Sequence, residues 1–118
     1  MNVIVAGGRD FTDTERMHRE LIILCKAGHV DADATLVCGM ARGADITAFR
    51  LWKQFGNPII EMPADWDSWG KRAGYIRNTE MARKADVLVA FWDGESRGTG
   101  HMISTMAAMN KPVYVVRY

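Results

Sequence analysis

Residues 35–45, TLVCGMARGAD, hold the local signals around which the fold is predicted. The run Thr35–Cys38 is short and apolar, as in a buried strand. Gly39 and Gly43 then enclose a turn in which the backbone is free to take left-handed conformations. From Asp45 onward, apolar side chains recur at helical spacing. The segment therefore predicts a strand that passes, through a tight turn at a sheet edge, into a helix.

The same turn predicts a site for an anion. The first N–H groups of a helix have no partner within the helix and attract phosphate or carboxylate. Arg42 adds a planar cation that suits the same groups. In the alternative interpretation Gly43 only permits the connection and Arg42 is a solvated surface charge, and the turn alone leaves both open.

Strands and helices alternate along the rest of the chain. Strands are predicted at 2–6, 35–38, 59–62, 86–92 and 112–116, and helices at 13–27, 45–55, 75–84 and 102–109. Residues 64–74, rich in Trp, Asp and Gly, are predicted to form a loop. Alternation through short links implies parallel β-α-β units with right-handed crossovers. We therefore predict a Rossmann-like three-layer α/β sandwich with a five-stranded, mainly parallel sheet, formed by residues 1–118 as a single domain.

Composition limits the classes of function. The 118 residues are 48% hydrophobic and 25% charged, which suits one globular domain, and the net charge of +1 gives no global attraction to nucleic acid or to a membrane. No apolar run approaches a bilayer span and the N-terminus leads directly into a predicted strand, so we expect a cytoplasmic protein without a membrane partner. Cys25 and Cys38 lie apart from each other and from any histidine cluster, so no disulfide, metal site or cofactor is predicted.

Four loops are predicted at the carboxyl edge of the sheet, where parallel sheets bind ligands. The loops are Gly7-Gly8-Arg9, Gly39–Asp45, Pro63–Trp69 and Asp93–Thr99. The first and last repeat the combination of glycines and a helix start, which favours a phosphate ligand. Neither matches the phosphate loop of the P-loop hydrolases or the three-glycine dinucleotide fingerprint, which disfavours those two classes. The residues predicted to bind the ligand are Gly7, Gly8, Arg9, Gly39, Arg42, Gly43, Ala44, Asp45, Arg77, Asn78, Gly98 and Thr99.

Aromatic and charged side chains surround this edge. Arg77 follows the predicted loop that carries Trp66 and Trp69, and an arginine beside aromatic rings can hold a phosphate while a ring stacks on a base. A packed loop or an oligomer contact is the preferred interpretation of the tryptophans, and a ligand role that of Arg77. The carboxylates near the rim suit ribose hydroxyls or general-base chemistry, although an aspartate that starts a helix is more often a cap; they are Asp45, Asp65, Asp93 and Glu95.

A set of short motifs spans the chain. They are GGRDF at 7–11, GxARGAD at 39–45, PADW at 63–66, GxxRNxxM at 74–81, AD at 85–86 and GT at 98–99. In this order they resemble the YspA/cpYpsA-related branch of the SLOG superfamily, compact Rossmann-like proteins of bacteria and phages. The resemblance implies a small-molecule ligand, a nucleotide or a derivative such as ADP-ribose, NAD or a nucleoside monophosphate, and a homodimer or larger homo-oligomer.

The superfamily includes phosphoribohydrolases of the Lonely Guy type and the DNA-processing protein DprA. In the hydrolases an Arg before the central strand and a Glu three positions after the Gly-Thr pair act on an N-glycosidic bond. The resemblance places Arg77 at the Arg but Met102 at the Glu, and methionine cannot activate water, so that mechanism does not carry over intact.

Three functions follow from these observations. The leading one is a sensor or sequestering protein that binds a nucleotide-derived ligand. The first alternative is an N-glycosidase in which Arg77 acts with Asp93 or Glu95. The second is a single-stranded DNA binder that uses Arg42, Arg72 and the tryptophans, which the near-neutral charge disfavours.

Overall fold

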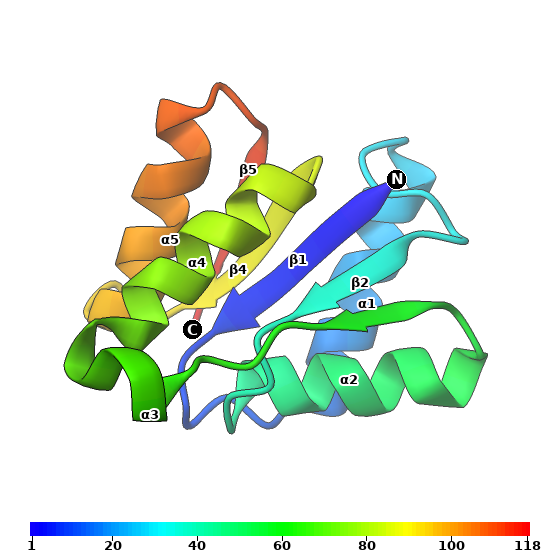
Figure 1. The fold of residues 1–118 in the computed structure, drawn as a ribbon. Helices are drawn as coiled ribbons and strands as arrows, with labels where there is room; N and C mark the ends of the chain where they lie inside the picture. Colours follow the sequence, from blue (N-terminus) through cyan, green and yellow to red (C-terminus); the bar gives the residue numbers. More distant parts are fainter.

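Five strands and five α-helices alternate in the computed structural model, which describes all 118 residues (Figure 1). The strands are β1 Asn2–Gly7, β2 Thr35–Cys38, β3 Ile59–Glu61, β4 Val87–Trp92 and β5 Val113–Arg117. The helices are α1 Thr14–Lys26, α2 Ala44–Phe55, α3 Trp66–Trp69, α4 Ala73–Lys84 and α5 Arg97–Ala108, with a 3-10 turn, η1, at Gly70–Arg72. None of the helices combines the length and apolar character that crossing a membrane requires.

All five strands are parallel, in the order β3-β2-β1-β4-β5. The chain moves outward from β1 to β3 and then returns to β4, which pairs with the other side of β1 in a register that sets Gly7 opposite Phe91. This confirms the predicted Rossmann-like fold class. Because the order reverses between β1 and β4, a crevice is expected outside the carboxyl ends of these two strands.

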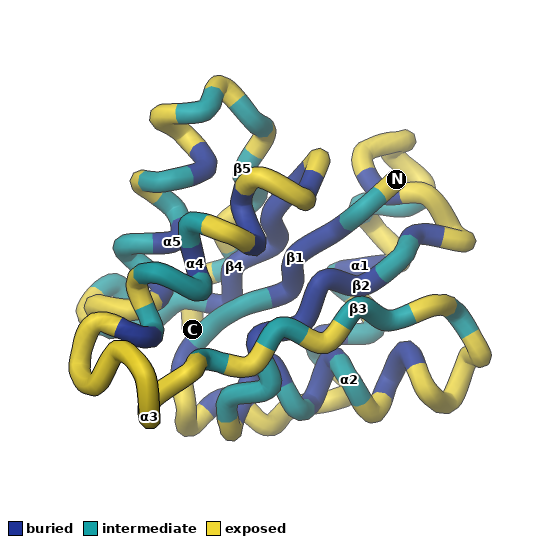
Figure 2. Tube along the Cα trace, in the orientation of Figure 1, coloured by how far each residue is buried: buried dark blue, intermediate teal, exposed yellow.

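Helices cover both faces of the sheet. Along β1, Val3 and Val5 contribute to the core on the face of α1 and α2, and Ile4 contributes to the core on the face of α4 and α5. Figure 2 shows the central strands as buried and the turn around α3 as exposed. The two cores fix the helices against the sheet and thereby set the helix ends at its carboxyl edge.

Two segments differ from the predicted boundaries. The predicted loop 64–74 contains α3, whose first turn is capped where the Asp65 side chain accepts the Ser68 N–H at 3.1 Å. Helix α5 begins at Arg97, five residues before the apolar spacing that predicted it. In both segments the polar turn chemistry makes the helix, and no apolar periodicity marks it in the sequence.

Candidate ligand-binding cleft

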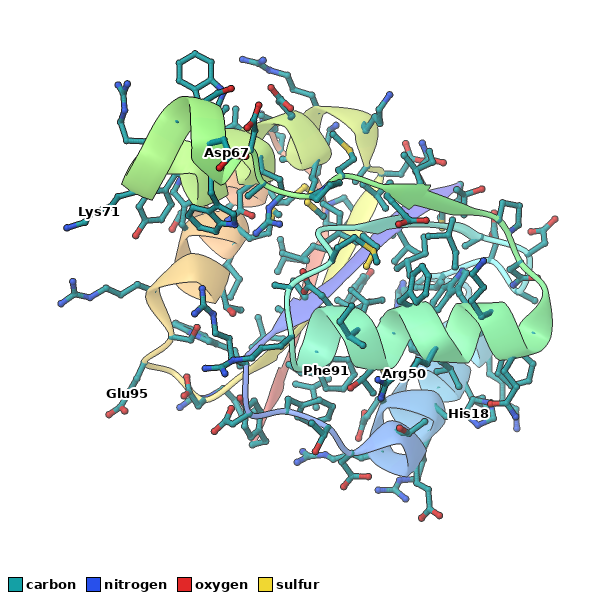
Figure 3. The ribbon with its side chains drawn as sticks, turned by 60° about the horizontal axis from the view of Figure 1, so that its bottom comes forward. His18, Arg50, Asp67, Lys71, Phe91 and Glu95 are labelled. Carbon is teal, nitrogen blue, oxygen red and sulfur yellow. The ribbon has the colours of Figure 1, made fainter.

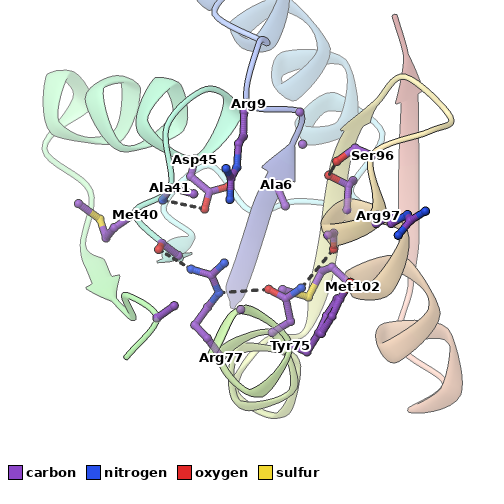
Figure 4. A pocket seen from close by; sticks show the side chains of 18 of the residues that line it. Ala6, Arg9, Met40, Ala41, Asp45, Tyr75, Arg77, Ser96, Arg97 and Met102 are labelled. Carbon is purple, nitrogen blue, oxygen red and sulfur yellow. Dashed lines mark hydrogen bonds between the residues drawn. The ribbon is translucent and has the colours of Figure 1, made fainter. Parts of the chain in front are cut away.

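The carboxyl ends of β1 to β4 surround a cleft of about 720 Å³, a volume in the range of ligand sites (Figure 4). Its walls come from the loop after β1, the turn after β2, the α3–η1 segment, α4 and the first turn of α5. Ten of the predicted site residues line it: Gly7, Gly8, Arg9, Gly39, Asp45, Arg77, Asn78, Asp93, Gly98 and Thr99. Four do not line it: Arg42, Gly43, Ala44 and Glu95.

The turn that predicted an anion site packs onto the loop after β1. Gly43 has φ +84°, and a Cβ there would overlap the Gly8 carbonyl oxygen and the Arg9 backbone. The N–H of Ala44, the first residue of α2, donates to the Gly8 carbonyl at 3.1 Å. Arg42 is exposed and lies outside the cleft lining. The observed contacts of Gly43 and Ala44 are therefore packing contacts between two loops.

The first turn of α5 is open. The N–H groups of Arg97, Gly98 and Thr99 make no backbone hydrogen bond, and the N-cap residue, Ser96, gives no side-chain cap. The hydroxyls of Ser96 and Thr99 lie 3.3 Å apart at the same end. Free N–H groups at the positive end of a helix dipole form a binding site for an anion. The helix whose first turn is free to bind an anion is therefore α5, and the Arg97 side chain lies beside that turn.

Arg77 is held in the cleft by a chain of hydrogen bonds, drawn in Figure 4. Its Nη1 donates to the Gly39 carbonyl at 2.5 Å and its Nε donates to Asn78 Oδ1 at 3.1 Å. The buried Asn78 amide donates in turn to the Gly98 carbonyl at 3.2 Å and lies 3.3 Å from His101 Nδ1. This series of hydrogen bonds links the end of β2 to the start of α5. It leaves Arg77 Nη2 without a hydrogen-bond partner.

Asp45 is a buried carboxylate in the wall of the cleft, only 7% exposed. Its Oδ2 accepts the Ala41 N–H at 3.2 Å. Burial raises the pKa of the Asp45 carboxyl to about 6, against the opposing effects of that hydrogen bond and of the Arg77 charge. Asp45 is thus a poorly solvated acid beside a fixed cation, an arrangement found more often at functional sites than elsewhere.

The other two predicted carboxylates have different surroundings. Asp93 Oδ1 accepts the N–H groups of Ser96 at 2.8 Å and Glu95 at 2.9 Å, and these bonds hold the pKa of Asp93 below its usual range. Glu95 is exposed and points away from the molecule in Figure 3. The structure therefore does not bring Arg77, Asp93 and Glu95 together as one group.

Several charged lining residues, Asp10, Lys71 and Arg97, lay outside the predicted set. With the predicted Arg9, Asp45, Arg77 and Asp93 they make four basic and three acidic side chains in the cleft wall. Trp66 and Tyr75 line it while about half exposed, and the buried side chain of Met102 adds an apolar surface. Arg97 could have been found from its place before the Gly-Thr pair, whereas no sequence signal pointed to Tyr75. No group of three or more His, Cys, Asp or Glu side chains is placed to hold a metal ion.

The parallel strand order and a cleft over the β1–β4 reversal define a Rossmann-like α/β protein with a ligand cleft at the carboxyl edge of its sheet. Within that class, the chain belongs to the YspA, cpYpsA-related SLOG family, whose model matches residues 1–69. The Gene 61 protein of Mycobacterium phage D29 is 45% identical over 84 residues, which cover 66% of this chain and 67% of that protein. No solved structure matches the chain.

Proposed function

We propose that this protein binds a nucleotide or nucleotide-derived ligand, of the nucleoside monophosphate or ADP-ribose kind, in the cleft at the carboxyl edge. The observation that carries the proposal is the open first turn of α5, whose residues Arg97, Gly98 and Thr99 line the same cleft as Arg77 and have N–H groups without a hydrogen-bond partner. Membership of the SLOG family, which suggests nucleotide-related binding or processing, supports the same class of ligand.

The proposed orientation of the ligand follows from the chemistry of the walls. The phosphate binds at the start of α5, because this is where the cleft offers free backbone donors. The base stacks against Trp66 and Tyr75, whose half-exposed rings line the cleft on the side of α4. Base–aromatic stacking contributes about 1–3 kcal/mol per base, which adds to the affinity without requiring a particular base.

Calorimetry against AMP, ADP-ribose, NAD and cyclic nucleotides tests the proposal. We expect one or more of them to bind, and Arg97→Ala to weaken that binding roughly 10- to 100-fold, since a charge-assisted hydrogen bond contributes about 1.5–3 kcal/mol. Arg42→Ala is the matched control, because it removes the same charge from an exposed position outside the cleft. Absence of binding across the panel, or an equal loss in Arg42→Ala, would contradict the proposal.

The two alternative functions were predicted on other residues. The N-glycosidase was predicted to pair Arg77 with Asp93 or Glu95, but Glu95 lies outside the cleft and Asp93 Oδ1 is engaged in its own turn. A single-stranded DNA site was predicted on Arg42, Arg72 and the tryptophans. Arg72 lies over the Trp69 ring at 6.0 Å, but Arg42 is not in the cleft that Trp66 lines. The cytoplasmic location and the homo-oligomer stay predictions, the latter testable by light scattering on the purified protein.

A further inference from the structure

Asp45, a residue of the cleft wall, has one carboxylate oxygen without a hydrogen-bond partner. Only Oδ2 of its carboxylate has a hydrogen-bond partner, the Ala41 N–H. Every fully buried side-chain oxygen of this structure has a hydrogen-bond partner. Since Asp45 Oδ1 has none, it is not fully buried. The surface to which Asp45 contributes is the wall of the cleft. The Asp45 carboxylate is more than nine-tenths buried, and the Ala41 N–H is its one hydrogen-bond donor. One neutral donor does not replace all the hydrogen bonds with water that the carboxylate loses on burial. The carboxylate therefore offers a strong acceptor to a ligand.

A cationic donor lies beside that acceptor. A Cβ on Gly39 would lie 2.6 Å from Arg77 Nη1 and 2.8 Å from Asp45 Oδ2, yet the two side chains form no ion pair. Figure 4 shows them pointing toward one another, and Arg77 Nη2 has no partner. Gly39 therefore allows the Arg77 and Asp45 side chains to lie close together, because any larger residue would displace them, and each keeps one polar atom without a partner.

This pair selects one kind of ligand group. A phosphate only accepts hydrogen bonds and is repelled by the carboxylate, and an amino group of a base only donates and leaves Arg77 unmatched. A hydroxyl donates to Asp45 and accepts from Arg77 at the same time. The sugar hydroxyls are therefore the groups of a nucleotide that best match this wall.

The strand order separates Asp45 from the proposed phosphate site. The loop after β4 carries the phosphate site and the turn after β2 carries Asp45, with β1 between the two strands. With strands about 4.8 Å apart, the end of β2 lies about 10 Å from the end of β4. Asp45 is therefore placed to contact a part of the ligand other than the phosphate.

We infer that Asp45, with Arg77, binds the ribose hydroxyls of the ligand and makes the cleft selective for ribonucleotides over their deoxy analogues. The inference rests on the proposed function and adds to it the part of the ligand that is discriminated. Asp45 is a specificity-determining residue in this assignment, and no bond is made or broken.

Calorimetry of the full chain with AMP, 2′-deoxy-AMP and 3′-deoxy-AMP tests the inference. We expect AMP to bind at least roughly tenfold more tightly than the deoxy analogue whose missing hydroxyl Asp45 contacts, since a hydrogen bond to a charged group is lost. In Asp45→Asn, which keeps an oxygen for the Ala41 N–H, we expect the three affinities to converge to within about twofold. Asp86→Asn is the matched control, because Asp86 Oδ2 likewise accepts one backbone N–H, that of Asn2 at 2.7 Å, and Asp86 does not line the cleft.

The outcomes separate the inference from the proposed function. Equal affinity of the wild-type protein for all three nucleotides would refute the ribose assignment and leave nucleotide binding intact, and this comparison does not depend on any variant folding. A discrimination that survives Asp45→Asn, or that Asp86→Asn also removes, would refute the role of Asp45. Failure of every nucleotide in the larger panel to bind would refute both.

Discussion

Replacing Asp45 by asparagine is expected to stabilise the unliganded protein at neutral pH. Burial raises the pKa of the Asp45 carboxyl from 3.8 to about 6. One pKa unit corresponds to about 1.4 kcal/mol, so ionising this group in the folded protein costs roughly 3 kcal/mol well above pH 6. Asparagine removes the charge and retains an oxygen for the Ala41 N–H. The free energy of unfolding should therefore rise by up to about 3 kcal/mol.

The pH dependence of the gain has a definite sign. The folded protein binds the Asp45 proton more tightly than the unfolded chain does, because the pKa is raised on folding. This contribution to stability is fully present below about pH 4 and is lost as the pH rises through about 6. The difference between Asp45→Asn and the wild type should consequently be largest above pH 7 and small near pH 4.

Thermal unfolding followed by circular dichroism between pH 4 and pH 7.5 measures this difference. At pH 7.5 the expected increase in Tm is roughly 10 °C for a chain of this size. Asp93→Asn is the control with the opposite sign, because the Ser96 and Glu95 N–H groups lower the pKa of Asp93 and its loss should destabilise the protein at neutral pH. A Tm of Asp45→Asn below that of the wild type at pH 7.5, or a gain independent of pH, would refute the reasoning.

Three further substitutions probe the cleft and its supports. Gly39→Ala places a methyl group 2.6 Å from Arg77 Nη1 and 2.8 Å from Asp45 Oδ2, so calorimetry should show nucleotide affinity reduced by roughly tenfold or more while circular dichroism shows the fold retained. Gly100→Ala is its control, because the new Cβ meets only an ordinary contact at 3.5 Å within α5, and urea titration should show a gain of about 0.5–1 kcal/mol. Asn78→Ala removes the amide that orients Arg77 and should cost roughly 1–3 kcal/mol by urea titration, together with a loss of nucleotide affinity that a purely structural residue would not produce.

Most of the fold was predictable because its signals are periodic. The apolar runs of the central strands and the helical spacing of α1 and α2 each depend on one face of the element packing against a core. Helix α3 and the first turn of α5 have no such face, since Trp66 and Trp69 are exposed and the start of α5 lines the cleft. Their order comes from polar caps and turns, which leave a weaker trace in the sequence.

The sequence predicted which edge of the sheet carries the candidate site, but it did not predict which groups at that edge are free to donate hydrogen bonds. Arg42 and Arg97 each stand next to a glycine near a helix start, and the sequence gives no way to rank them. The structure separates them through a contact between residues far apart in the chain, the bond from the Ala44 N–H to the Gly8 carbonyl. That bond closes the start of α2, while the start of α5 has no equivalent. Such long-range contacts are fixed by the packing of whole elements, so local patterns do not contain them.

The positions of Met102 and Asp45 are the reason we propose binding over hydrolysis. Met102 is buried and lines the cleft near the open end of α5, so the position at which hydrolase relatives are expected to carry a Glu presents an apolar surface. An apolar surface disfavours a charged intermediate and provides no group to activate water. The remaining buried carboxylate, Asp45, lies beyond β1 from α5, where its free oxygen suits a sugar hydroxyl. In the binding mode that we propose, the charges of the cleft hold the two polar parts of a nucleotide, and Met102 presents an apolar surface where the resemblance implies the hydrolytic Glu.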